Sequence, residues 1–264
     1  MSEDLSKENI ESVTKFLECE IDVETRDENG KTLLHTACIE GDFEVVKYIV
    51  RKGANIEAKV EWGWTPLLFA SANGHFEVVK FLIEMGADIS AKGNDGCTSL
   101  LNAARNGNFE IVKFLVGNGA DIEIRDEDGM SPLGLAAQNG YLEVVKFLVE
   151  KGARIEVREL YGRTPLMLAA WFEHFEVVKF LVENGADIES KDGYGYTPLS
   201  WAVSHSRFRP KGYNMSDKSM VIKFLLSKGA RFSRQDMEAV LKEIPKEKMI
   251  EAGYYWDLHD ATFR

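Results

Sequence analysis

The stretch that decides the fold is residues 63–96, which read GWTPLLFASANGHFEVVKFLIEMGADISAKGNDG. It contains Gly63, Gly74, Gly86 and Gly96, and the same glycine pattern continues on both sides with a period of 33 residues. Of the 22 glycines in the chain, 16 fall on three phases of this period. Self-similarity at a fixed period of about 20–50 residues is typical of a repeat architecture.

Each unit predicts two short helices followed by an extended stretch. Thr65 can cap free N–H groups at a helix start, and Pro66 suits the first helical position because that N–H needs no partner. The phrase FEVVKFL at 76–82 places apolar residues three and four apart, which predicts a buried stripe on a second helix. Gly86 suits the left-handed end of that helix. Ile89, in the extended stretch, is expected to fill the core.

This pattern resembles the ankyrin repeat family, whose unit follows roughly G-x-T-P-L-H-x-A … G-A-D. The chain carries the pattern at Gly30–Ala37 (GKTLLHTA), Gly63–Leu67 (GWTPL) and Gly185–Asp187 (GAD). The resemblance implies an all-α repeat solenoid, in which every 33-residue unit supplies two helices and a projecting β-turn. Glu173 replaces the mid-repeat glycine of one unit, so the loop geometry there is an open question.

The resemblance also divides the chain. The expected units are an N-terminal capping half-repeat at 1–26, six repeats at 27–59, 60–92, 93–125, 126–158, 159–191 and 192–235, and a C-terminal cap with an aromatic tail at 236–264. The sixth repeat carries an 11-residue insertion near 206–217, between its two helices. This insertion is either a functional loop or a tolerated surface loop. The tail either packs over the last repeat or is a linear motif for a partner.

Composition argues against several classes of protein. The 264 residues carry a formal net charge of −11, which disfavours general nucleic-acid binding. No apolar run approaches the roughly 18 residues of a membrane span, so we expect no membrane insertion. The three cysteines are too few and too irregularly spaced for a disulfide framework or a zinc site. Free thiols without an export signal favour the reducing cytoplasm or nucleus.

No catalytic arrangement is visible in the sequence. None of the five histidines has a cysteine or histidine at metal-ligand spacing, and no G-x-S-x-G, phosphate-binding glycine loop or H-E-x-x-H occurs. Catalysis needs groups that converge in a pocket, whereas a solenoid offers an extended concave surface. We therefore expect no enzyme activity, no cofactor and no metal site.

The ankyrin resemblance implies that a protein partner binds the turn tips and the inner face of the first helices. Aromatic residues and arginine are favoured at binding hot spots, and exposed apolar groups often mark interfaces. The expected partner-binding residues are Trp62, Trp64, Met130, Leu160, Tyr161, Arg163, Trp171, Phe172, Tyr194, Tyr196 and, in the insertion, Phe208. Alternatively, some of these rings stack on neighbouring tips and only stabilise the solenoid, and Trp171 and Phe172 fill space left by the missing glycine.

A second pattern is electrostatic. Four residues before each turn glycine lies a base: Arg26, Lys59, Lys92, Arg125, Arg158 and Lys191. Two residues earlier lies an acid in five repeats: Glu24, Glu57, Glu123, Glu156 and Glu189. Residues two apart in an extended stretch point the same way, so stacked repeats should carry parallel rows of acids and bases. The rows either form ion pairs between repeats, each worth little, or the basic row receives an acidic partner segment.

The sequence thus predicts a non-catalytic protein-binding module that is monomeric when free and binds on its concave face. Two alternatives stay open. The chain could be an inhibitory or targeting subunit of an enzyme, or a structural scaffold in a larger assembly.

Overall fold

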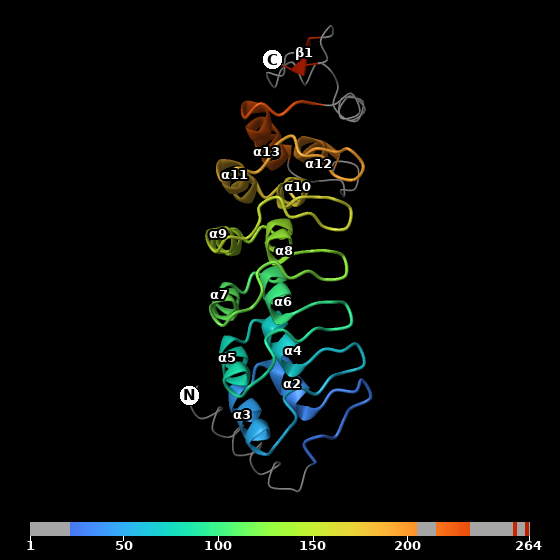
Figure 1. Cartoon of the computed structure of the whole chain (residues 1–264), viewed down its shortest axis with the longest axis vertical. Helices are drawn as coiled ribbons and strands as arrows, with labels where there is room; N and C mark the ends of the chain where they lie inside the picture. The colour runs from blue at the N-terminus through green and yellow to red at the C-terminus, as the bar shows by residue number, and fades with distance from the viewer. Residues whose placement is uncertain (1–21, 205–214, 233–255, 258–261, 264) are drawn as a thin grey trace.

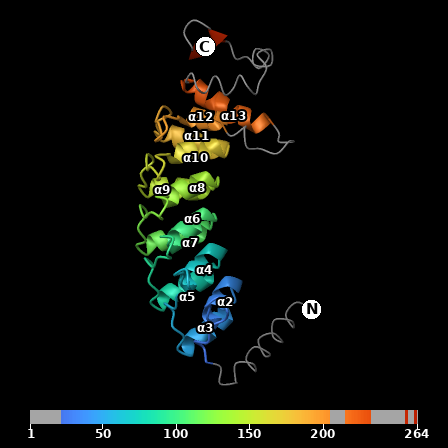
Figure 2. The ribbon, with the colours of Figure 1, turned by 90° about the vertical axis from the view of Figure 1, so that its right-hand side faces the viewer.

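The computed structural model describes residues 22–204, 215–232, 256–257 and 262–263. Pairs of short helices stack along these residues into an elongated solenoid, and the loops between pairs project to one side (Figure 1). The stack curves gently along its length (Figure 2). Segments 1–21, 205–214 and 233–255 lie outside the described residues, so the structure does not test the predicted caps and most of the insertion.

One column of helices, here called inner, follows the turn glycines. It contains α2 (Leu33–Glu40), α4 (Pro66–Asn73), α6 (Ser99–Arg105), α8 (Pro132–Gln138), α10 (Pro165–Trp171) and α12 (Pro198–Ser204). The predicted caps are present at four of these helices, because the hydroxyls of Thr98, Ser131, Thr164 and Thr197 accept backbone N–H groups at 3.1–3.4 Å. The Thr65 hydroxyl makes no such bond to the described residues.

The outer column carries the repeated FEVVKFL phrase. It contains α3 (Phe43–Arg51), α5 (Phe76–Glu84), α7 (Phe109–Gly117), α9 (Leu142–Glu150), α11 (Phe175–Glu183) and α13 (Met215–Ser227). Val78, Val79 and Leu82 of α5 are at most 1% exposed, as the apolar spacing predicts. The first phenylalanine of one phrase meets the second of the next helix edge to face, as Phe76 does with Phe114 at 5.7 Å between ring centroids.

The end of the expected insertion is helical. Helix α13 begins at Met215, so residues 215–217 extend this helix rather than lie in a loop, and α13 has 13 residues where α11 has nine. Near the C-terminus, β1 (Trp256–Asp257) pairs antiparallel with β2 (Thr262–Phe263). The all-α prediction therefore holds for the repeats, with one two-residue strand pair outside them.

The periodic glycines supply the left-handed backbone conformation at nearly every described turn. Among the described residues, the glycines with positive φ are the 16 periodic ones, with φ between 73° and 96°. Glu173 has φ 63° and is the one non-glycine residue of the described chain in this left-handed region. The loop therefore keeps the geometry of its neighbours although a side chain has replaced glycine there.

The acidic and basic rows tie successive repeats through the backbone. A carboxylate oxygen of Glu57 accepts the backbone N–H of Asp88 at 2.8 Å, and the other four acids make the equivalent bond at 2.7–3.0 Å. Nη1 of Arg26 donates to the carbonyl of Lys59 at 2.7 Å, and Arg125 and Arg158 repeat this contact. Of the two interpretations of these rows, ion pairs between them are wrong for the described residues, because backbone groups are the partners. Glu123 also pairs with Arg154 of the next repeat at 2.9 Å, but Arg154 is outside the basic row.

The extended stretches also complete the core. Their aliphatic residues (Val23, Ile56, Ile89, Ile122, Ile155 and Ile188) are half-buried and pack against the helices. Within the described part of the chain, no helix combines the length and the apolar character needed to cross a bilayer.

Candidate binding surface

The residues predicted to bind a partner separate by exposure. The side chains that face solvent are Trp62, Leu160, Tyr161, Tyr194 and Tyr196, between 38% and 67% exposed. The half-buried ones are Trp64, Arg163, Trp171 and Phe172. Met130 is 7% exposed, and Phe208 lies outside the described residues. The exposed members other than Trp62 all belong to the tips of repeats 5 and 6.

Met130 was wrongly predicted as a surface contact. It packs in a small core cluster with Leu101, Leu135 and Leu168. Met130 directly follows a turn glycine, and Cys97, which has the same place in repeat 3, is 1% exposed. At these two tips the position after the glycine is directed toward the inner helices, so it packs inward.

Trp64 has the same place in repeat 2 and also packs inward. Its ring lies 5.1 Å from that of Phe69, between centroids. A Cβ added at Gly93 of the next tip would lie 2.6 Å from Trp64 Cδ1, so the indole lies directly against that backbone. Trp64 therefore stabilises the stack, as the alternative interpretation proposed, whereas Trp62 is 42% exposed.

An acid at the base of tip 5 fixes the tip backbone. Oε1 of Glu159 accepts the backbone N–H groups of Tyr161 and Arg163 at 3.0 and 2.9 Å. The guanidinium of Arg163 donates to both carboxylate oxygens of Glu159, from Nε to Oε1 and from Nη2 to Oε2, each at 3.1 Å. Burial alone would raise the pKa of Glu159, but the bonds from Arg163 and the backbone outweigh it and hold this pKa below its usual value.

Aromatic rings surround the same guanidinium. Cζ of Arg163 lies 5.2 Å from the ring centroid of Tyr161, 5.1 Å from that of Trp171 and 5.6 Å from that of Trp201. The rings of Trp171 and Trp201 are 4.7 Å apart. These distances are within the range of cation–π attraction. We call Tyr161, Arg163, Trp171, Tyr196 and Trp201 the aromatic cluster.

Tip 6 is joined to this cluster by a second acid. Oδ1 of Asp192 accepts the backbone N–H groups of Tyr194 and Tyr196, both at 2.9 Å. Its Oδ2 accepts the indole N–H of Trp201 at 3.0 Å. The Tyr196 ring meets that of Trp201 at 5.9 Å. The two tips and the inner helices α10 and α12 are thus held together by one continuous set of contacts.

Phe172 extends the surface toward the end of α10. Its ring is stacked on that of His174 at 6.4 Å, with 18° between the planes. Nε2 of His174 lies 3.0 Å from the carbonyl oxygen of Gln138 in the preceding repeat, and burial lowers the pKa of this imidazole. His75 makes the equivalent contact with the carbonyl of Ile39 at 2.9 Å. Both histidines therefore join neighbouring repeats.

The comparisons with known families agree with this architecture. A family model described as ankyrin repeats in three copies matches residues 4–93, 100–192 and 157–236, and one described as ankyrin repeats in many copies matches residues 75–116. This chain belongs to the ankyrin repeat family. Ankyrin repeats are generally protein–protein interaction modules and are typically non-catalytic. A search of curated proteins found no match.

Among the described residues, His35, Cys38 and Cys97 are enclosed by the repeat structure. His35 bonds the Thr32 hydroxyl at 2.9 Å and the Ala58 carbonyl at 3.0 Å, and its burial lowers its pKa. Burial raises the pKa of the Cys38 thiol well above its usual range and that of Cys97 to about 11. Within the described ranges, no three His, Cys, Asp or Glu side chains gather in a way that could hold a metal ion.

Sequence reasoning missed the acids that support the ankyrin tips. Glu159 and Asp192 were not among the predicted residues, although each stands three residues before a turn glycine. Asp27 and Asp126 have the same place and also accept N–H groups of their own turns. This spacing is the signal that could have identified them.

Proposed function

We propose that this ankyrin-repeat chain is a non-catalytic protein-binding module whose partner docks across the tips of repeats 5 and 6. The observation that carries this proposal is a run of exposed apolar side chains on two adjacent tips: Leu160, Tyr161, Tyr194 and Tyr196. Such residues are favoured at the centres of protein interfaces. The tips of repeats 3 and 4 instead expose polar residues, among them Asn94, Asp95, Glu127 and Asp128.

The structure around these side chains supports binding by a rigid surface. Glu159 and Asp192 hold the two turns, and Arg163 fixes the rings behind them. Groups that are ordered before binding lose little conformational entropy on association. The half-buried Trp171 and Phe172 would form the floor of this surface, and Trp62 would provide a separate contact on repeat 2.

The partner in this proposal is a protein rather than a nucleic acid or a membrane. The net charge of −11 and the exposed acids on tips 3 and 4 would repel a phosphate backbone. We also propose that the free chain is monomeric and works in the cytoplasm or nucleus. The buried free thiols Cys38 and Cys97 suit such a reducing environment.

Affinity capture from a cell lysate tests the proposal. The test variant is Tyr161→Ala combined with Tyr194→Ala, and the matched control is Met85→Ala, which removes an exposed apolar side chain from the end of α5. We expect the test variant to retain its circular dichroism spectrum but to capture at least tenfold less partner than the unmodified chain. The control should capture as much partner as the unmodified chain. Equal capture by both variants would refute docking at the aromatic tips.

The same experiment separates the alternative functions. If the captured partner is an enzyme, its activity with and without the chain distinguishes an inhibitory subunit from a targeting one. Self-association of the purified chain in sedimentation would favour a scaffold.

A further inference from the structure

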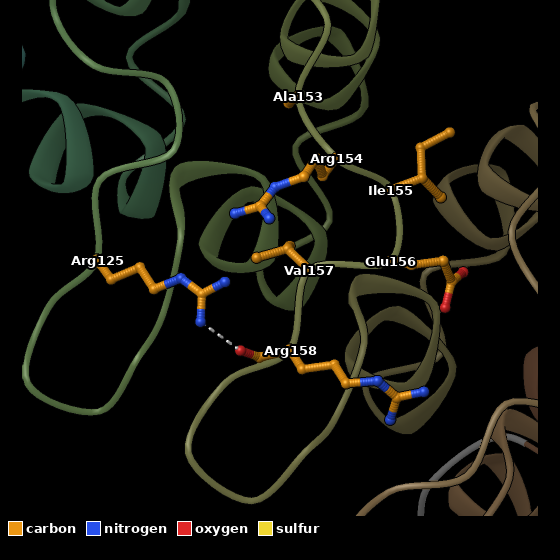
Figure 3. Close-up of a pocket in the computed structure, with 7 residues that line it drawn as sticks. All are labelled: Arg125, Ala153, Arg154, Ile155, Glu156, Val157 and Arg158. Atoms are coloured by element: carbon orange, nitrogen blue, oxygen red, sulfur yellow. Dashed lines mark hydrogen bonds between the residues drawn. The ribbon is translucent and has the colours of Figure 1, made fainter.

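A second feature lies away from the aromatic tips. An open groove of about 600 Å³ runs along the extended stretch between α9 and the tip of repeat 5 (Figure 3). Its lining includes Arg125, Arg154 and Arg158 around the apolar side chains of Ala153, Ile155 and Val157. None of these residues belongs to the surface proposed above. The proposed function leaves this groove without a role.

The sequence makes this groove different from the others in the stack. Arg154 stands where other repeats have Asn55, Asp88, Asp121 and Asp187. The two flanking members of the basic row, Arg125 and Arg158, are both arginine here, whereas every other neighbouring pair of that row includes a lysine. Arg231 has the place of Arg154 at the last junction, but the chain beyond residue 232 lies outside the described part. Among the junctions between full repeats, arginine occupies all three positions only where the extended stretches that end repeats 3 and 4 lie side by side.

Hydrogen bonds hold each of the three guanidinium groups. Nη1 of Arg125 donates to the carbonyl of Arg158 at 2.9 Å, and Nη1 of Arg158 donates to that of Lys191 at 2.6 Å. Nε of Arg154 donates to Glu123 at 2.9 Å. That contact is an ion pair with the Glu123 carboxylate and uses the Nε–H, and the two Nη groups of Arg154 make no further hydrogen bond within the described residues.

The arrangement favours an anion despite the acidic composition of the chain. Figure 3 shows the Arg125 and Arg154 side chains extending from opposite sides toward the space over Val157. Glu156 also lines the groove, but it is turned away from those two arginines, and its Oε1 accepts the backbone N–H of Asp187 at 3.0 Å. Two guanidinium groups that extend toward one space attract an anion there, although the ion pair of Arg154 with Glu123 offsets part of that charge.

We propose that this groove binds an anionic group, a phosphate or a carboxylate, carried by a segment of a partner protein. The planar fork of arginine matches both oxyanions and can bind each through two parallel N–H···O bonds. Val157 and Ala153 are 7% and 6% exposed and supply an apolar floor for the carbon atoms next to the anion. The basic row as a whole does not form this site, because the other junctions between full repeats place Asn or Asp where Arg154 stands.

A titration followed by NMR tests this proposal. The probes are inorganic phosphate and, separately, acetate, each added at constant ionic strength against sodium chloride. We expect the side-chain Nε–Hε signals of Arg125 and Arg154 to shift saturably. Arg51 of α3 is exposed and does not line the groove, so its signal reports non-specific binding. Saturation by phosphate alone would identify a phosphorylated ligand, and saturation by both probes would admit a carboxylate.

Two variants sharpen the test. Arg154→Asp gives this position the residue found at 88, 121 and 187, so we expect it to fold, and it should weaken probe binding at least fivefold. Arg154→Lys keeps the charge but loses the planar fork and should give an intermediate loss. The proposal fails if neither probe saturates, if Arg51 shifts as much as Arg154, or if Arg154→Asp binds the probe like the unmodified chain.

Discussion

The tips of repeats 4 and 5 share one hydrogen-bonding arrangement, an acid bound by an arginine, but present different surfaces. In each, an acid three residues before the turn glycine accepts backbone N–H groups of the turn, Asp126 in one and Glu159 in the other. An arginine then binds the acid: Nη2 of Arg105 reaches Asp126 at 3.0 Å, and Nη2 of Arg163 reaches Glu159 at 3.1 Å. The difference lies in what surrounds the arginine.

Arg105 comes from α6 of the preceding repeat, and its side chain is 38% exposed. Arg163 comes from its own tip, is 15% exposed and lies among three aromatic rings. The hydrogen bonds therefore build the tip, whereas the residues packed around them decide whether the tip is polar or aromatic. Replacing each arginine by alanine should show how much the stability of each tip depends on it.

We expect the largest effect from Arg163→Ala. It leaves the Glu159 carboxylate, 3% exposed, without its guanidinium partner, and removing one member of a buried pair typically costs about 3–5 kcal/mol. Because Arg163 retains some exposure, we expect about 3 kcal/mol. Arg105→Ala should cost about 1 kcal/mol, because water can replace a more exposed arginine. Urea unfolding of both variants measures the difference.

A double variant provides the control for this prediction. Glu159→Gln added to Arg163→Ala removes the stranded charge and should recover part of the lost stability. Equal losses for Arg163→Ala and Arg105→Ala would show that the aromatic surroundings add nothing to the pair.

A second comparison concerns the glycine that Glu173 replaces. Gly140 has the same place in repeat 4, with φ 77°, and a Cβ added there would lie 2.4 Å from Nδ1 of His174. Gly140→Ala should therefore combine backbone strain with displacement of that ring and cost about 2 kcal/mol. Gly152→Ala, at φ 91° with open space around it, should cost only about 1 kcal/mol.

Thermal or urea unfolding of the two alanine variants checks this expectation. Equal losses would show that the contact between the loop and His174 carries no energy. Glu173 itself shows that a residue with a side chain can adopt the left-handed conformation at this position.

The period of 33 was enough to predict the helices and the glycines of the turns, because each rests on local patterns. It was not enough for side-chain direction at the tips. Trp62 and Trp64 are two residues apart, yet one is exposed and the other packs against the next tip. That difference depends on the neighbouring repeat. The partners of the acidic row depend on it too, since Glu57 binds the backbone N–H of Asp88 in the next repeat rather than a basic side chain. The sequence also did not predict that the aromatic cluster surrounds Arg163, because one of its rings, Trp201, comes from the next repeat.

The smallest expected effect is a difference in pH dependence between the two tips. Burial raises the pKa of Asp126 above its ordinary value, and the bonds from Met130 and Arg105 do not fully offset it. The pKa of Glu159 lies below its ordinary value, because burial is outweighed by Arg163 and the backbone donors. A lowered folded-state pKa stabilises above the unfolded pKa and is lost as pH falls, whereas a raised one stabilises at low pH and is lost as pH rises.

The two acids should therefore change the acid unfolding curve in opposite directions. Removing the Glu159 charge with Glu159→Gln removes a contribution that fades on acidification, so the stability of this variant should fall less steeply between about pH 7 and pH 3 than that of the unmodified chain. Asp126→Asn removes a contribution that grows on acidification, so its stability should fall more steeply. Urea unfolding free energies across this range give both slopes. If both variants change the slope in the same direction, the two tips do not differ in how they hold their acids, and the exposed Arg105 neutralises Asp126 as completely as the enclosed Arg163 neutralises Glu159.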